Sequence, residues 1–171
     1  WREANKDQSK PHATFSTNEA EKNAGGAICI CVRKRPISRR EVNNKDHDAV
    51  SCVHPSVVVH DCRLRVDGIS KYLNNQQFAF DHAFSENEDT AEIYRCVGGP
   101  LVEFVTRDDG RACIFAYGQT GSGKTYTMEG VQARAAVQVF QELSSERSVG
   151  VSFFEIYGGR CQDLLRARAR L

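Results

Sequence analysis

Eight consecutive residues in the second half of the chain could bind phosphate. Gly118–Thr125 (GQTGSGKT) fits the pattern G-x-x-x-x-G-K-[ST] at every specified position. Glycines let the backbone bring N–H groups close to phosphate oxygens, and a following helix adds partial positive charge. Lys124 supplies a point charge for the β- and γ-phosphates, and the Thr125 hydroxyl is the expected Mg²⁺ ligand. The predicted cofactors are therefore ATP or ADP with Mg²⁺. The predicted cofactor-binding residues of this loop are Gly118, Gln119, Thr120, Gly121, Ser122, Gly123, Lys124 and Thr125.

The sequence on either side supports this interpretation. Residues 112–117 form a continuous apolar run that predicts a fully buried strand, and a helix is expected to begin at Lys124. Average residue usage gives about a one-in-a-hundred chance of the pattern arising in such a chain. The alternative, a glycine-rich surface turn with an incidental lysine, is disfavoured by the strand–loop–helix context.

Seven cysteines are the other residues with possible site chemistry. They form no C-x-x-C pair and leave one residue over. Cys29 and Cys31, two apart on one face of a predicted strand, could form half of a metal site, but no second ligand pair accompanies them. We interpret the cysteines as reduced core residues of an intracellular protein.

Composition limits the classes of partner. The chain has 171 residues, enough for one domain, and 23 Lys and Arg against 22 Asp and Glu, a formal charge of +1. No global field attracts nucleic acid or a membrane surface. Residues 1–26 are polar and aperiodic and predict a flexible leader without a signal-peptide apolar region, and no apolar run reaches membrane-spanning length. We expect neither nucleic-acid polymers nor membranes as partners.

The elements that must position the loop follow from periodicity over residues 27–171. A buried strand is expected at 27–32, ending in a charged exit, and a polar loop at 38–48. A helix capped by Asp89 or Thr90 is expected to kink or to split at residues 98–100, where two glycines precede a proline. The other expected elements are short β-segments at 57–60 and 64–66 with a break near Asp61, a helix at 131–143 with Val137 and Phe140 facing inward, and a β-segment at 149–157 before a Gly158-Gly159 turn.

Four segments together resemble the kinesin motor domain. Residues 115–128 (FAYGQTGSGKTYTM) resemble the kinesin phosphate loop, and 32–36 (VRKRP), 80–84 (FDHAF) and 153–157 (FFEIY, with DLL at 163–165) agree in order. The resemblance spans residues 27–171. It implies an α/β, P-loop NTPase-like kinesin motor fold with a mixed central sheet flanked by helices, incomplete at its C-terminal side. It also implies tubulin or microtubules as partner, and a cytoplasmic location on the microtubule cytoskeleton, with the spindle as one candidate.

The resemblance also implies where the base binds. In kinesins an Arg-x-Arg-Pro segment packs on the adenine, which carries over to Arg33, Arg35 and Pro36. The residue after the loop threonine, here Tyr126, closes the other side. Guanidinium and aromatic planes suit a purine face. Without the resemblance, residues 33–35 would be interpreted as a solvated basic loop.

A finer resemblance is to the internal-motor class of kinesins, which depolymerises microtubules. Its marks are the RKRP form, residues 64–67 (LRVD) and residues 71–76 (KYLNNQ). That class carries Lys-Val-Asp at a hairpin tip, which corresponds here to Arg65, Val66 and Asp67, with Arg replacing Lys. These residues are expected to contact the microtubule. Alone, they would be interpreted as an exposed charged tip.

Two hydrolytic segments of the family do not occur in this sequence. These are the switch segments, Asn-x-x-Ser-Ser-Arg-Ser-His and Asp-Leu-Ala-Gly-Ser-Glu. No catalytic residue is identified, and whether the chain is an ATPase stays open. The alternatives are a motor fragment, a non-catalytic nucleotide- or tubulin-binding module, and an unrelated P-loop kinase or transport ATPase. The segments flanking the loop disfavour the last.

Overall fold

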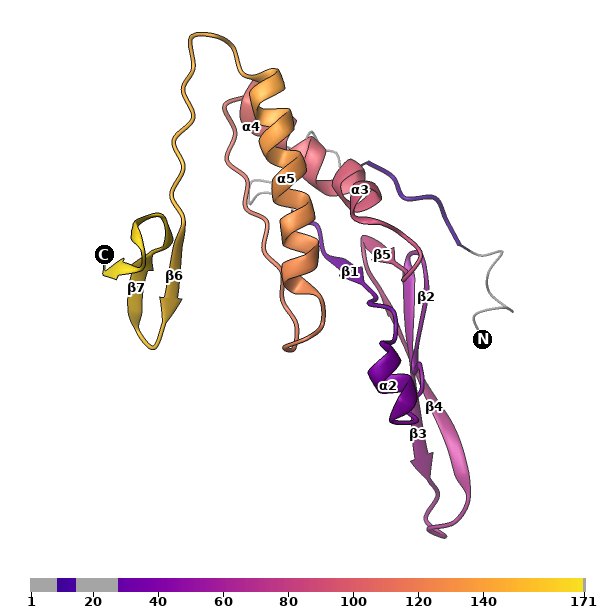
Figure 1. Ribbon diagram of the computed structural model, residues 1–171. Helices are drawn as coiled ribbons and strands as arrows, with labels where there is room; N and C mark the ends of the chain where they lie inside the picture. Colours follow the sequence, from indigo (N-terminus) through magenta and orange to yellow (C-terminus); the bar gives the residue numbers. More distant parts are fainter. Residues whose placement is uncertain (1–8, 15–27, 171) are drawn as a thin grey trace.

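The computed structural model describes residues 9–14 and 28–170 (Figure 1). The expected domain start at residue 27 lies outside the described residues. Residues 9–14, inside the predicted leader, lie against the first strands: the Lys10 amide donates to the His54 carbonyl at 3.0 Å. The first half comprises β1 (Cys31–Arg33), α2 (Arg39–Asn43), β2 (Val50–Val53), β3 (Ser56–Leu64), β4 (Lys71–Ala79), β5 (His82–Phe84) and α3 (Thr90–Ile93). The second half comprises the π-helix η2 (Tyr94–Gly98), α4 (Gly99–Arg107), α5 (Lys124–Glu142), β6 (Phe154–Tyr157), β7 (Arg160–Asp163), the 3-10 helix η3 (Leu164–Arg166) and β8 (Ala169–Arg170).

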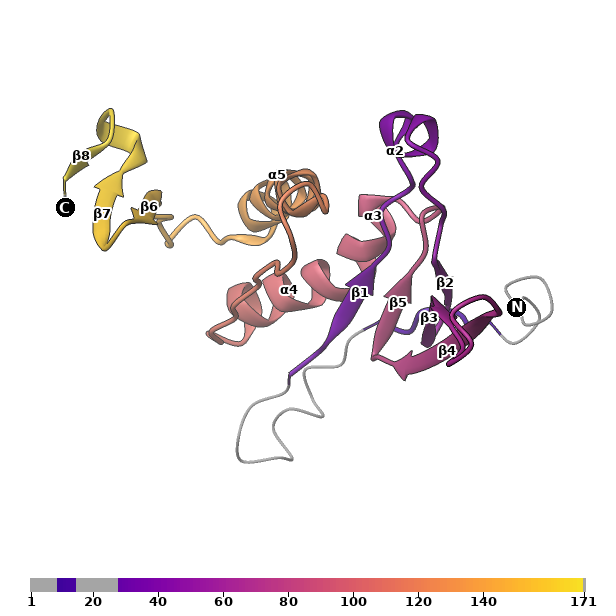
Figure 2. The same cartoon turned by 90° about the horizontal axis from the view of Figure 1, so that it is seen from below.

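The strands form three small sheets in the described part of the chain. β1 and β5 pair in parallel, β2-β3-β4 form an antiparallel meander, and β6-β7-β8 form a second antiparallel sheet. Both views place the β6-β7-β8 sheet apart from the other elements (Figures 1 and 2). Parallel and antiparallel pairs together with the helices make an α/β fold, as predicted.

Two apolar clusters hold the first half together. Cys52 of β2, Val57 of β3 and Ala83 of β5 form one cluster. Phe84 of β5, which is fully buried, packs against Ile93 and Cys96 from the helices and forms the other. Successive residues of β5 thus face opposite layers, as the alternation of a strand requires. β5 therefore joins the β2-β3-β4 meander to the α3-η2-α4 helices (Figure 2).

The predicted helix start is confirmed, and of the two expected outcomes at residues 98–100 the helix is split. Asp89 caps α3, its Oδ1 accepting the Glu92 amide at 2.8 Å. The chain then passes through the π-helix η2 before α4 begins at Gly99, with Pro100 in its first turn. A Cβ on Gly98 would lie 2.6 Å from the Tyr94 ring, so a side chain there would collide with that ring. The predicted Gly158-Gly159 turn is also present, with φ of +57° and +73°.

The predicted buried strand at 112–117 is wrong. This segment has no strand conformation, and Phe115 and Tyr117 are 83% and 97% exposed. The strand predicted at 27–32 is reduced to the three residues of β1, and Ile28 and Ile30 are exposed. An apolar run becomes a buried strand only where neighbouring strands satisfy both its edges and other layers cover its faces. β1 has one neighbour, and residues 112–117 pair with no described strand.

Three smaller expectations also fail. β3 runs through Asp61 without a break, because Asp61 pairs with Asn74 in a continuous ladder. The polar loop predicted at 38–48 contains α2, which starts with a Ser38–Glu41 capping box. Val137 and Phe140 of α5 are 58% and 69% exposed, and Val131 is the buried apolar residue of this helix.

Among the helices of the described residues, none is long and apolar enough to cross a membrane.

The cysteines are not uniformly core residues, contrary to expectation. Cys52 and Cys96 are buried, whereas Cys31, Cys62 and Cys113 are exposed. The Sγ atoms of Cys29 and Cys31 lie 3.6 Å apart on one face of the extended chain. The expectation fails because it treated local apolar runs as buried, and the strands that carry those runs are partly uncovered.

Candidate nucleotide-binding site

Positive φ angles shape the loop at residues 118–125. Gly121 and Gly123 have φ of +82° and +97°, a region that other residues rarely adopt. Gly118 has φ of +154°, and a Cβ there would lie 2.7 Å from Ser122 Oγ. The Ser122 amide donates to the Gln119 carbonyl at 3.1 Å, which closes the turn. The glycines are therefore required by the path of the backbone, as the pattern predicts.

The loop leads directly into the N-terminus of α5. Gly123 is the N-cap of this 19-residue helix, and no side chain caps its first amides. Those amides and the helix dipole are available to an anion. Thr125, the predicted Mg²⁺ ligand, lies in the first turn and is exposed. This geometry suits phosphate oxygens at the loop and a hydrated cation beside Thr125.

Lys124 folds back over the loop. Its Nζ donates to the carbonyls of Gly118 and Gln119, each at 2.8 Å. The ammonium group is thus held at the loop by weakly charged acceptors. A triphosphate would offer it fully charged oxygens, which form stronger hydrogen bonds than carbonyls do. The side chain is placed to exchange its partners when phosphate binds.

Arg33 connects three elements beside the loop. Its Nη1 donates to Thr90 Oγ1 and to Thr127 Oγ1, both at 2.9 Å, and its Nη2 donates to the Glu88 carbonyl at 3.4 Å. Its Cζ lies 5.2 Å from the centroid of the Tyr126 ring, within cation–π distance. The structure therefore places Arg33 directly against the Tyr126 ring next to the loop, whereas the resemblance implies that the two close opposite sides of the base. Thr90 and Thr127 were not predicted as partners.

Arg35 and Pro36 lie at the exit of β1. Arg35 pairs with Glu41 and donates from Nη1 to the Pro36 carbonyl at 3.0 Å. Arg35 is the main reason that the pKa of Glu41 falls to about 2, with the Ser38 amide and hydroxyl adding to the effect. The Arg35 side chain passes 3.9 Å from the position a Cβ on Gly123 would take, so it runs beside the loop. Glu41 was missed, although the Ser38-x-x-Glu41 spacing signals a capping box.

Lys34 was also missed as a structural residue. It is buried and forms ion pairs with Asp48 and with Glu86 Oε2, the latter at 3.2 Å. Two carboxylates around one buried ammonium anchor the segment between Arg33 and Arg35. The backbone that carries Arg33 and Arg35 is therefore held in place.

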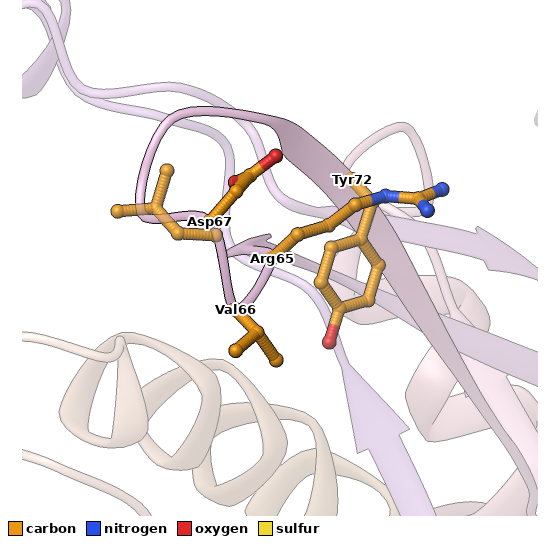
Figure 3. A pocket seen from close by; sticks show the side chains of 5 residues that line it. Arg65, Val66, Asp67 and Tyr72 are labelled. Atoms are coloured by element: carbon orange, nitrogen blue, oxygen red, sulfur yellow. The ribbon is translucent and has the colours of Figure 1, made fainter.

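The predicted microtubule-contact residues lie far from this loop, at the end of the β3–β4 hairpin. The nine-residue strands project beyond the other elements (Figure 1). Val66 is fully exposed at the tip. With Arg65, Asp67, Leu64 and Tyr72 it lines a shallow hollow (Figure 3).

The tip is held by Asp67. Its Oδ1 accepts the amides of Ile69 and Ser70, each at 2.9 Å, and its Oδ2 accepts the Ser70 hydroxyl. The Ser70 hydroxyl and these amides lower the pKa of Asp67. Asp67 thus shapes the turn, whereas Arg65 and Val66 present their side chains outward (Figure 3).

Comparison with known proteins identifies the family. A family model described as the kinesin motor domain matches residues 33–170, most of the chain. This chain belongs to the kinesin motor domain family. The kinesin chain is 45% identical over 167 residues to diatom spindle kinesin-1 of Cylindrotheca fusiformis, covering 96% of this chain and 26% of that relative.

A solved structure supports the same fold. It is a KIF14 dimer in a two-heads-bound state, with AMP-PNP and in complex with a microtubule. It matches with a TM-score of 0.63 and 28% identity, covering 81% of this kinesin chain and 40% of that one. The kinesin chain therefore has the predicted motor fold and spans less than half the length of both matches.

Arg33 should contribute to stability as well as to any base contact. We expect Arg33→Ala to lower the free energy of unfolding by about 2 kcal/mol, because three acceptors, one each on α3, on α5 and in the loop before α3, lose a charged donor. Arg33→Lys should recover only part, since an ammonium lacks the planar fork. Urea denaturation measures both, with the exposed Arg39→Ala as control. Equal stability of Arg33→Ala and the parent would contradict this role.

Proposed function

We propose that this kinesin chain binds Mg-ATP through residues 118–125 and forms the nucleotide-binding part of a microtubule motor. One observation carries the proposal: the loop places Lys124 Nζ on its own carbonyls at the uncapped N-terminus of α5. Charge, amides and helix dipole then converge where β- and γ-phosphates would lie. Thr125 would hold Mg²⁺. Calorimetry with ATP, in the presence and absence of Mg²⁺, tests the proposal.

The base would lie beside Arg33 and Tyr126. The Arg33 guanidinium occupies one face of the Tyr126 ring, and 68% of Tyr126 remains exposed. Pro36 and Arg35 would complete the adenine contact. Because these contacts are planar surfaces and not a set of matched donors and acceptors, discrimination between purines should be modest.

We propose microtubules as the partner of this chain. The proposed location is the microtubule cytoskeleton, including the spindle. A microtubule-bound KIF14 structure and a diatom kinesin named for the spindle are among the proteins similar to this chain. The formal charge of +1 means that any contact with a charged partner depends on a local surface. The hairpin tip at residues 65–67 is the surface we assign to it.

We further propose that the motor is of the depolymerising, internal-motor class. The support is the length of the β3–β4 hairpin and the exposure of its tip, where the apolar side chain of Val66 is fully exposed. A two-stranded arm with an apolar and a basic residue exposed at its end can contact a tubulin surface. The sequence resemblance at residues 64–67 and 71–76 points the same way.

A second candidate function is a nucleotide- and tubulin-binding module without catalysis. The observation that favours it is that the residues assigned here account for binding, with Lys124 and Thr125 at the phosphate loop and Arg65 and Val66 at the hairpin tip. The two candidates share nucleotide binding and differ in turnover, so an ATPase assay on a longer form that carries both switch segments separates them.

The tip predicts a selective effect on microtubules. We expect the double variant Arg65→Ala/Val66→Ala to weaken microtubule binding about tenfold, with nucleotide binding unchanged, because exposed contacts affect recognition more than folding. Asp67 is kept because its carboxylate forms the turn. Co-sedimentation with microtubules measures the effect. The matched control is Arg39→Ala/Val42→Ala on exposed positions of α2. Equal weakening by both double variants, or by neither, would overturn the assignment of the tip.

A further inference from the structure

Three histidines from distant parts of the sequence gather in one place. His12 precedes the sheets, His54 lies at the β2–β3 turn, and His82 begins β5. The ring centroids of His12 lie 4.1 Å from His54 and 5.4 Å from His82, and one nitrogen of each ring lies within 4.8 Å of the others. His54 and His82 are buried, and the His12 side chain is 6% exposed. The phosphate loop contributes nothing to this cluster.

The nitrogen atoms face one another. His12 Nδ1 lies 3.1 Å from His82 Nδ1. At this distance at most one of the two nitrogens carries a proton, and the other accepts it through its lone pair. On the other side of its ring, His12 Nε2 lies 3.5 Å from Glu88 Oε1. The second Glu88 oxygen accepts both the amide and the hydroxyl of Ser85, which fixes the carboxylate. A carboxylate that faces one nitrogen of a histidine helps to orient that ring toward the other ligands.

Burial favours the neutral form of two of these histidines, His54 and His82. Burial, followed by the neighbouring His12 and His82, lowers the pKa of His54 to about 4, and burial also lowers the pKa of His82. The charged groups that act on the cluster are Glu88 and Lys10 at His54, and Asp81 and Arg95 at His82. Neutral imidazole is the form that binds metal ions.

We propose that His12, His54 and His82 form a binding site for a divalent transition-metal ion of the zinc class, with Glu88 as the group that orients His12. A zinc–nitrogen bond of about 2.0–2.1 Å places two tetrahedral ligands about 3.3–3.4 Å apart, close to the His12–His82 separation. His54 must move inward and exchange the Ala83 amide, now 3.2 Å from its Nδ1, for the ion. The bound ion would fasten residues 9–14 to β5 and the β2–β3 turn.

Titration with Co²⁺ tests the site on the full chain. We expect one equivalent to bind and give visible ligand-field absorption without thiolate charge-transfer bands, and Zn²⁺ to displace it. His12→Gln and His82→Gln should each weaken binding by about 100-fold or more, and Glu88→Gln by about tenfold. His47→Gln, at an exposed loop position, should leave it unchanged. No binding by the parent, an equal loss in His47→Gln, or thiolate bands that vanish in Cys29→Ser would overturn the proposal.

A second measurement guards against misfolded variants. The Lys10 amide, which donates to His54, should exchange with deuterium at least about tenfold more slowly when Zn²⁺ is present. His12 lies outside the paired strands, so His12→Gln should fold and lose this protection. Protection by Zn²⁺ that persists in His12→Gln would contradict the site.

Discussion

We expect Lys124→Ala to weaken Mg-ATP binding by at least about 100-fold while leaving the far-ultraviolet circular dichroism unchanged. Lys124 Nζ now bonds two carbonyls of its own loop, and no buried contact depends on it. On binding, it would form two hydrogen bonds to charged phosphate oxygens. At about 1.5–3 kcal/mol each, their loss corresponds to a factor of about 100 or more.

The control for this variant is Lys71→Ala, which removes a lysine from an exposed position on β4, remote from the loop. Calorimetry with ATP and Mg²⁺ measures all three proteins. The control should bind as the parent does. If Lys124→Ala bound ATP as tightly as the parent, the assignment of the loop would be wrong.

The second large effect concerns turnover. We expect this 171-residue chain to hydrolyse ATP about 10³ to 10⁵ times more slowly than a complete kinesin motor domain, with microtubules present. Lys124 and Thr125 would bind phosphate and metal in our proposal, but phosphoryl transfer also needs groups that orient water and stabilise charge on the γ-phosphate. The two switch segments that supply them in the family do not occur in this sequence.

A coupled phosphate-release assay, run beside a complete motor domain, measures this rate. The Lys124→Ala variant sets the background, because it should not bind nucleotide. Microtubule-stimulated turnover within about tenfold of the complete motor would contradict the expectation and remove the non-catalytic alternative.

The features that sequence predicts well here are set by local physics. Gly121 and Gly123 adopt positive φ because the path of the loop requires it, and glycine is the residue type that takes this conformation readily. The position of the glycines in the pattern therefore predicts the conformation of the loop. The Asp89 cap and the interruption at Gly98 follow equally from neighbouring residues. The loop, the helix after it and the helix interruption before it can therefore be predicted from the local sequence alone.

Burial depends on elements that the local sequence does not describe. The run at 112–117 has the composition of a core strand, yet Phe115 is exposed because no described strand pairs with this segment. Phe140 follows helical spacing, but α5 meets the other elements through residues such as Gln138, which accepts the Tyr94 hydroxyl. A hydrophobic period shows which residues share a face and not whether that face is covered.

Contacts between residues far apart in the sequence are the other feature that the sequence does not predict. Arg33 reaches Thr90 and Thr127 across the fold, and it lies directly against the Tyr126 ring. His12 lies in a segment whose composition predicts a flexible leader, and its packing on Phe84, 4.3 Å between ring centroids, has no local signal. Such contacts require the topology that brings β1, β5 and α5 together.

The central claim is that residues 118–125 bind the phosphates of a nucleotide, and amide nuclear magnetic resonance tests it most directly. Titration of the ¹⁵N-labelled chain with Mg-ATP should shift the amide signals of Gly121, Gly123 and Lys124 first, together with Tyr126. Mg-AMP, which lacks the β- and γ-phosphates, should leave the three loop signals nearly unmoved. Loop signals that stay fixed at saturating Mg-ATP, or that respond equally to AMP, would contradict the claim.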